Sequence, residues 1–200
     1  MEIFVMMGKI GVGKNYIAEK ILLPALSKSN PKPTLILGLA DHFKITAVSF
    51  NNMEYDKVFH QKDSSSRLKL QAIGTEMGRD KYGDDIWINV LYNWIKLHNE
   101  RGIERFIIID CRFKNETEFF KKINAYIIKI IAPDRNYQKL IQESNGDLNV
   151  LTNLSTHSSE IYIDQFTEYD LLINNQINQS DNISNDINNF ILNVFIKSPN

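Results

Sequence analysis

The apolar positions of this chain gather in five short runs that have the length of β-strands. The runs cover residues 3–7, 34–40, 105–110, 126–131 and 169–174, and turn residues or polar segments bound them. Short continuous apolar runs are typical of strands that are buried on both faces of a sheet. The pattern therefore predicts five strands, most of them fully buried.

Segments with helical periodicity lie between these runs. Helices are predicted over residues 14–27, 67–78, 86–102 and 183–195, where apolar residues recur every three to four positions. Pro31 and Pro33 stop the first helix, Ser64 to Ser66 cap the second, and Asp84 and Asp85 cap the third. Leu70, Ile73 and Met77 form the apolar face of the second helix, and both tryptophans of the third are expected in the core.

Two stretches fit neither pattern. Residues 50–63 are polar and aromatic without a clear period, and residues 134–156 form a long polar segment. A loop as long as the second is expected to be functional or disordered. Without an internal repeat or a composition shift, the 200 residues predict one α/β domain, residues 1–200.

The composition limits which partners and which cellular compartment are expected for the protein. The net charge is −1, so no basic field argues for a nucleic-acid polymer as partner. The single cysteine, Cys111, excludes an internal disulfide framework and fits a reducing compartment. No apolar run reaches the roughly 20 residues that cross a bilayer, and the chain begins with a strand in place of a signal sequence. A cytoplasmic protein that does not bind membranes is expected.

The clearest chemical signal is the glycine-rich turn after the first strand. Gly8, Gly11 and Gly13 lead into Lys14, Asn15 and Tyr16, the start of the first helix. Strand, glycine-rich turn and helix is the context of a P-loop, whose N–H groups hold phosphate while the lysine reaches the terminal phosphates. The usual Ser or Thr ligand of magnesium is Asn15 here, whose amide oxygen can still hold the metal or its water. A glycine-rich turn without a ligand is the alternative.

Polar residues also follow two other strands at the sheet edge where open α/β proteins bind ligands. Asp41, His42 and Lys44 follow the second strand, and His42 is equally well explained as a partly buried or capping imidazole. Asp110 ends the third strand in the manner of a Walker B acid that holds magnesium, and Arg112 follows it.

The predicted helix at residues 67–78 contains a second cluster of candidate site residues. Arg67, Gly74 and Gly78 share one face with Gln71 beside them, and Arg79 follows at the end. Glycine in a helix costs about 1 kcal/mol against alanine, so two on one face suggest that something packs against the backbone. Taken alone, this face is better explained as a solvated polar face with its glycines at a kink or a C-cap.

Six short stretches, in order along the chain, resemble the deoxynucleoside monophosphate kinases of bacteriophages and large DNA viruses. They are the P-loop and residues 40–44, 70–79, 85–87, 109–116 and 157–160. Two positions depart from the family pattern: Asn15 stands where the family often has Asp, and Lys114 stands where it has Pro. Both changes affect the expected handling of magnesium more than that of the nucleotide.

The resemblance implies a three-layer P-loop fold, like that of nucleoside monophosphate kinases, with a five-stranded parallel sheet flanked by helices. It implies a helical monophosphate-binding region at about 41–100 and a mobile lid at about 133–157. ATP and Mg²⁺ are the implied cofactors, with Gly8, Gly11, Gly13, Lys14, Asn15 and Tyr16 at the triphosphate and Asn15 and Asp110 at the metal. The catalytic residues would be Lys14, Arg112 and Arg135, and the deoxynucleoside monophosphate would meet Asp41, Lys44, Arg67, Gln71, Arg79, Asp85, Trp87 and Asp110.

The expected reaction is transfer of the γ-phosphoryl group of ATP to a deoxynucleoside 5′-monophosphate. Two other functions stay open. A kinase for another small phosphate, such as a phosphomevalonate kinase of the animal type, has a similar P-loop, and a nucleotide-binding module without catalysis would tolerate Asn15. The resemblance also makes a homodimer plausible and, for a viral protein, places it in the host cytoplasm.

Overall fold

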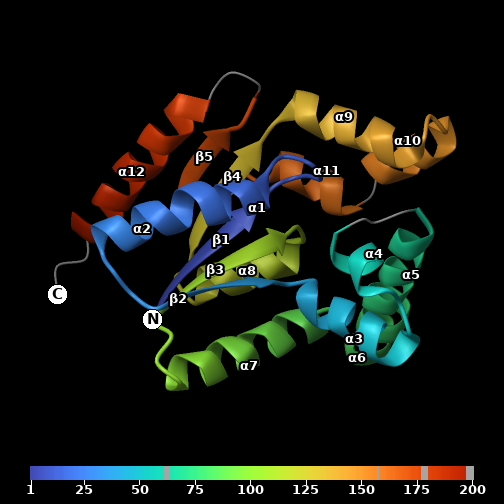
Figure 1. Cartoon of the computed structure of the whole chain (residues 1–200), viewed down its shortest axis with the longest axis horizontal. Coiled ribbons are helices and arrows are strands. Elements are labelled where there is room, and N and C mark those ends of the chain that lie inside the picture. The colour runs from blue at the N-terminus through green and yellow to red at the C-terminus, as the bar shows by residue number, and fades with distance from the viewer. Residues whose placement is uncertain (61–63, 157, 177–179, 197–200) are drawn as a thin grey trace.

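Five parallel strands form the centre of the molecule. The computed structural model describes residues 1–60, 64–156, 158–176 and 180–196. The strands follow the order β2-β3-β1-β4-β5 (Figure 1), and their bounds are β1 Glu2–Met7, β2 Thr34–Gly38, β3 Arg105–Cys111, β4 Tyr126–Ile131 and β5 Leu171–Asn174. All five strands predicted from the apolar runs are present, with bounds that differ by up to two residues. Since β1 lies in the middle, the turn that follows it opens at the centre of the sheet edge.

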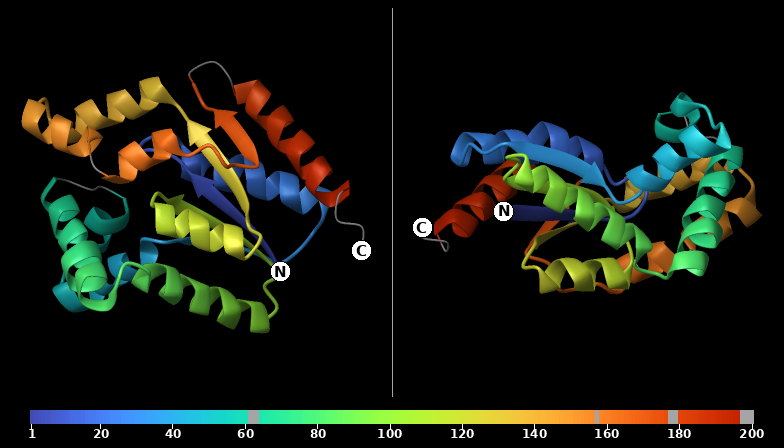
Figure 2. Two further views of the ribbon diagram at one scale, coloured as in Figure 1. Left: turned by 180° about the vertical axis from the view of Figure 1, so that it is seen from behind. Right: turned by 90° about the horizontal axis from the view of Figure 1, so that it is seen from below.

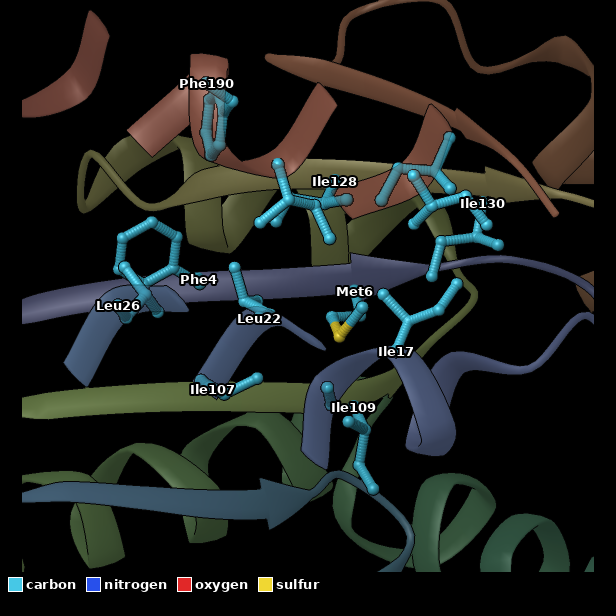
Figure 3. Close-up of a cluster of buried hydrophobic side chains, with 14 of the residues drawn as sticks. Phe4, Met6, Ile17, Leu22, Leu26, Ile107, Ile109, Ile128, Ile130 and Phe190 are labelled. Atoms are coloured by element: carbon cyan, nitrogen blue, oxygen red, sulfur yellow. The ribbon is translucent and has the colours of Figure 1, made fainter. Parts of the chain in front are cut away.

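One face of the sheet is covered by the first and last helices. A continuous helix comprises α1 (Lys14–Ile17), a π-helical turn (Ala18–Leu22) and α2 (Leu23–Ser29), and it packs beside α12 (Ser180–Ile196). The helix widens just before Pro24, which lacks the N–H that would bond back to residue 20. Figure 3 shows the buried core on this face, where Leu22 and Leu26 meet Phe4, Ile107 and Phe190.

The other face is covered by α7 (Ile86–Glu100), α8 (Lys114–Lys122) and α11 (Ser158–Gln165). These helices bury Leu91, Ile95, Phe120 and Ile163 against Val5, Ile108 and Ile127. The sheet thus lies between two helical layers, as the two views in Figure 2 show. The predicted three-layer α/β fold is confirmed.

A helical region extends from the carboxyl end of β2. It comprises α3 (Asp41–Asn51), α4 (Tyr55–Phe59), α5 (Ser64–Gly74), a π-helical turn (Thr75–Arg79) and α6 (Asp80–Tyr82), around a small core of Ala47, Val58, Leu70 and Ile73. Helix α4 was not predicted, because its five residues are too few to show a helical period. Met77 was predicted in the apolar face but is exposed, because the wider turn rotates it away from Leu70 and Ile73.

The long polar segment forms two helices, α9 (Pro133–Ser144) and α10 (Leu148–Ser155). Asn145 and Gly146 join them in left-handed conformations. Figure 1 shows α9 and α10 at the same end of the molecule as α4 and α5. Among the described helices, none is both long and apolar enough to cross a membrane.

Candidate functional site

The glycine-rich turn between β1 and α1 has the backbone that its sequence predicts. Gly11 and Gly13 adopt positive φ angles of 76° and 91°, a region that other residues rarely enter. Gly13 is also the N-cap of α1, so the turn ends at the positive end of the helix. The local geometry is that of an anion-binding loop.

Side chains from remote elements fix this turn. The Nδ2 group of Asn175, just after β5, donates to the Val12 carbonyl at 2.8 Å, and Nδ2 of Asn136 in α9 donates to the Ile10 carbonyl at 2.8 Å. The stem of Lys139 covers Gly11, where an added Cβ would lie 2.6 Å from the Lys139 Cβ. None of these residues was predicted, because a single sequence does not show which side chains from other strands and helices reach a loop.

Lys14 lies in the centre of the turn. Its ammonium donates to the carbonyl oxygens of Gly8 at 2.8 Å and Lys9 at 2.9 Å, and its side chain is buried. Burial, together with the positive charge of Arg112, lowers the pKa of Lys14 to about 7. An anion bound in the turn would raise this pKa again, so the site favours a ligand with negative charge.

Asp110 is turned toward the loop by a bulge in β3. The pairing of β1 with β3 shifts between Val5 and Met7, and Asp110 has a positive φ of 68°. Its Oδ2 lies 3.7 Å from the ammonium of Lys44, which also meets Oδ1 of Asp41 at 3.0 Å. Oδ2 of Asp41 accepts the N–H of Gly38, so Asp41 holds the end of β2 and the buried Lys44 together.

Two buried glutamates connect the arginines of the site. Oε1 of Glu116 accepts from Arg79 at 2.9 Å, and its Oε2 accepts the backbone N–H groups of Arg112 at 2.7 Å and Phe113 at 3.0 Å. Oε1 of Glu160 accepts from Nη1 of Arg112 at 3.0 Å. Burial raises the pKa of Glu116 although these donors oppose the shift. Both glutamates lie in family-like stretches, but the sequence does not reveal that their carboxylates are buried.

Aromatic rings line the side of the site that faces the helical region. Phe43 and Trp87 pack with their centroids 5.3 Å apart, and Nε1 of Trp87 donates to the Gly74 carbonyl at 2.8 Å. A Cβ added at Gly78 would lie 2.5 Å from Cζ2 of Trp87. The expectation that something packs against the helix backbone is met at Gly78 by Trp87, a side chain of the protein itself.

Other expectations about the α7 region also need correction. Trp94 was expected in the core, yet 42% of it is exposed and it stacks on His42 and His98. Asp85 occupies the N-cap position of α7, but its carboxylate makes no capping bond and instead accepts from Nδ2 of Asn115 at 2.8 Å. The stack leaves His42 partly buried, and burial lowers its pKa.

These groups share one cavity of about 560 Å³. From the predicted site it brings together ten residues: Gly11, Gly13, Lys14, Asn15, Tyr16, Lys44, Arg79, Trp87, Asp110 and Arg112. Gly8, Asp41, Asp85 and the exposed Arg135 do not line it, and the side chains of Arg67 and Gln71 lie outside the described part of the chain, as does His157. The cavity also contains unpredicted residues, among them Phe59, His60, Thr75, Lys139 and Glu160. The predicted roles of all these residues stay predictions.

The oxygen ligands for a magnesium ion are few. Within the described residues, no three His, Cys, Asp or Glu side chains are grouped so that they could hold a metal. Asp110 and Asn15 both line the cavity and offer one carboxylate and one amide oxygen. Mg²⁺ at phosphotransfer sites commonly uses one or two carboxylates and completes its shell with water and substrate phosphates. The donors present thus fit a magnesium ion that arrives with a phosphate ligand.

Comparison with known proteins agrees with this geometry. The sequence model of a family described as deoxynucleotide monophosphate kinase matches residues 14–146, more than half of the chain. A protein of Acanthamoeba polyphaga mimivirus, provisionally named as a deoxynucleotide monophosphate kinase, is 28% identical over 122 residues. That match covers 55% of this chain and 53% of the viral protein, so the chain spans about half the length of this curated relative.

A solved structure resembles this fold over nearly the whole chain. Shikimate kinase from Bacteroides thetaiotaomicron superimposes with a TM-score of 0.50 at 14% identity, covering 98% of this chain and 99% of the other. Dephospho-CoA kinase from Campylobacter jejuni gives a TM-score of 0.48 at 13% identity, covering 98% and 97% of the two chains. At such identities, the likeness to shikimate kinase concerns the fold alone.

Proposed function

The chain belongs to the deoxynucleotide monophosphate kinase family, and from this premise we propose that it transfers the γ-phosphoryl group of ATP to a deoxynucleoside 5′-monophosphate. The products are ADP and the deoxynucleoside diphosphate. One observation carries the proposal: a single cavity contains Lys14 in its glycine-rich turn and Arg79 and Arg112 from other elements. A site with cations on two sides suits two phosphate groups that must meet.

On the donor side, the turn would hold the β- and γ-phosphates of ATP. The N–H groups around Gly11 and Gly13 are already arranged in the left-handed turn, so little reorganisation is needed on binding. Lys14 would leave the carbonyl oxygens of Gly8 and Lys9 and contact the transferring phosphoryl group. Binding of phosphate charge would keep this lysine protonated.

On the acceptor side, Arg79 would bind the monophosphate. Glu116 and the Phe113 ring, 3.9 Å from the Arg79 guanidinium carbon, hold the arginine in place. The attacking oxygen belongs to an ionised phosphate, so no strong general base is needed. Catalysis is then alignment of the two phosphates and compensation of their charge.

Magnesium would be held by Asp110 and Asn15 together with the phosphates of ATP. It would compensate the charge that moves onto the leaving phosphate. The pair of Asp41 and Lys44 lies beside Asp110 and would keep its carboxylate oriented when the ion is absent.

Helices α9 and α10, within residues 133–157, would form the lid over the donor site. Lys139, Leu140, Glu143 and Leu154 from these helices already line the cavity. Closure over ATP would exclude water and so prevent hydrolysis. Arg135 is exposed near the start of α9, and its predicted catalytic role would require such a movement.

A coupled assay of ADP formation tests the proposal. ATP and Mg²⁺ are supplied with dTMP, dGMP, dCMP or dAMP, with each ribonucleotide counterpart, or with phosphomevalonate. We expect turnover of at least one deoxynucleotide, well above ATP hydrolysis without acceptor. Turnover of phosphomevalonate alone identifies another small-molecule kinase, and ATP binding without any turnover identifies a binding module.

A further inference from the structure

Glu160 at the start of α11 holds two parts of the site at once. The residue is 4% exposed; its Oε1 accepts from Nη1 of Arg112 at 3.0 Å, and its Oε2 accepts the backbone N–H of Ile10 at 3.3 Å. One of these donors belongs to the glycine-rich turn, and the other is Arg112, two residues after Asp110. The glutamate therefore fixes the distance between the turn and an arginine of the cavity.

Because the Glu160 carboxylate is buried, it depends on its hydrogen bond with Arg112. A carboxylate that leaves water must be compensated by well-placed donors, and removing one partner of a buried charge pair is strongly destabilising for the arrangement. The side chain of Arg112 is 26% exposed, and it lines the cavity. One Nη group is bound to Glu160, and a guanidinium has further N–H donors with which it could contact a phosphate.

Arg112 is also held at its backbone. Oε2 of Glu116 accepts the Arg112 N–H at 2.7 Å, while Oε1 of the same carboxylate holds Arg79. A continuous set of hydrogen bonds thus runs from Ile10 through Glu160, Arg112 and Glu116 to Arg79. All five residues line the cavity.

We propose that Glu160 is a positioning residue for phosphoryl transfer, which acts by holding the Arg112 guanidinium beside the turn that binds the transferring phosphate. This inference rests on the proposed function. Glu160 itself touches neither substrate. Its carboxylate keeps Arg112 at the distance from the turn at which one guanidinium can contact the γ-phosphate, and a displacement of about 1 Å at such a site can lower the rate about 100-fold.

The protein offers a matched control on the same helix. Asp164 of α11 also contacts the glycine-rich turn, through an ion pair of 2.6 Å with Lys9, but its side chain is 66% exposed. Exposed pairs contribute little to stability. Asp164→Asn therefore removes a carboxylate between α11 and the turn without changing Arg112.

The test is a double-mutant cycle of Glu160→Gln and Arg112→Lys. Glu160→Gln keeps the size of the side chain, but its NH₂ group would face either the Arg112 guanidinium or the Ile10 N–H, both of which are donors, so one hydrogen bond is lost. We therefore expect kcat to fall at least about tenfold, while the KM for the deoxynucleotide changes less than about threefold. If Glu160 acts through Arg112, the double variant is no slower than Arg112→Lys alone. Glu160→Asp keeps the charge and should recover part of kcat, and Asp164→Asn should stay within about twofold of the wild type.

The Kd of ATP is measured for the same set of variants, because ATP binding can be followed without the deoxynucleotide acceptor. Both single variants should weaken ATP binding, and their effects should not add, whereas Asp164→Asn leaves the Kd unchanged. Wild-type kcat in Glu160→Gln, or additive effects in either cycle, would overturn the proposal. If the wild type turns over no deoxynucleotide, the proposed function fails, and the ATP cycle alone then decides the role of Glu160. Thermal unfolding of each variant confirms that it is folded.

Discussion

The two sides of the cavity are built from different interactions. The glycine-rich turn is held by hydrogen bonds with Asn136 and Asn175, which donate, and with Glu160, which accepts; all three residues are far from the turn in the chain. The helical region opposite is held by aromatic packing, with Phe43 against Trp87 and Phe59 near Lys44. The turn therefore presents fixed N–H groups that suit one kind of ligand, the phosphate.

The aromatic side places fewer constraints on its ligand. Apolar contacts have no fixed direction, and among the residues whose burial is described the small core behind them has four buried members. We infer that changes on the donor side affect the chemical step, whereas changes on the acceptor side affect affinity and stability. Four tests, ordered from the largest expected loss of turnover to the smallest, examine this difference.

Lys14→Ala should cause the largest loss. The ammonium lies inside the turn, and losing one preorganised electrostatic contact of this kind costs roughly 3–4 kcal/mol, about 100- to 1000-fold in kcat. The midpoint of thermal unfolding should not fall, because the variant removes a buried, desolvated lysine. Lys20→Ala, which removes an exposed lysine of the same helix, is the control. Activity of Lys14→Ala within a few-fold of wild type would remove the turn from the mechanism.

Asn15 tests how the donor side handles the metal. Asn15→Leu leaves no oxygen for magnesium or its water, so we expect a loss of about tenfold or more and a higher Mg²⁺ requirement. Asn15→Asp restores the residue that is common in the family and should remain active with a lower requirement. Initial rates over a Mg²⁺ titration compare the three proteins. A leucine variant with the normal rate and Mg²⁺ requirement would leave Asp110 as the sole predicted ligand.

Arg79→Lys tests the acceptor side. Lysine keeps the charge but loses the guanidinium fork that binds Glu116 and that, in the proposed function, would also bind two oxygens of the monophosphate. We expect the KM for the deoxynucleotide to rise about tenfold while the KM for ATP changes less than about threefold. Arg67→Lys, from the same predicted set, is tested in the same way, and the exposed Arg101→Lys is the control. Should both variants weaken ATP and spare the acceptor, this helix belongs to the donor side.

The same difference explains what could be predicted from the sequence. The strands and the turn at Gly8 to Lys14 were predictable because short apolar runs and positive φ angles restrict the residue types locally. The family-like stretches added Arg79 and Arg112, which line the cavity. What these arginines bind could not be predicted, because Glu116 and Glu160 reach them only through tertiary contacts.

The acceptor side was less predictable for a physical reason. Helix periodicity assumes 3.6 residues per turn, and the π-helical turn at Thr75–Arg79 breaks that assumption, which moved Met77 to the surface. Glycines in a helix indicate close packing but not the identity of the packed group. At Gly78 that group is Trp87, a side chain of the protein itself.

Gly78→Ala should have the smallest effect on turnover and a clear effect on stability. The new Cβ would lie 2.5 Å from the Trp87 ring, whose Nε1 is bonded to the Gly74 carbonyl and resists movement. Overpacking of this kind costs about 1–3 kcal/mol, more than the gain of up to about 1 kcal/mol from alanine in a helix. Gly74→Ala is the matched control: its Cβ would meet Phe43 at 3.6 Å, an ordinary contact, so the helix gain remains. Urea unfolding should therefore show Gly78→Ala less stable and Gly74→Ala equal to or more stable than wild type. If the two variants are equally stable, the Trp87 ring can move away from the new Cβ at little cost. Aromatic packing would then stabilise the acceptor side less than the structure indicates.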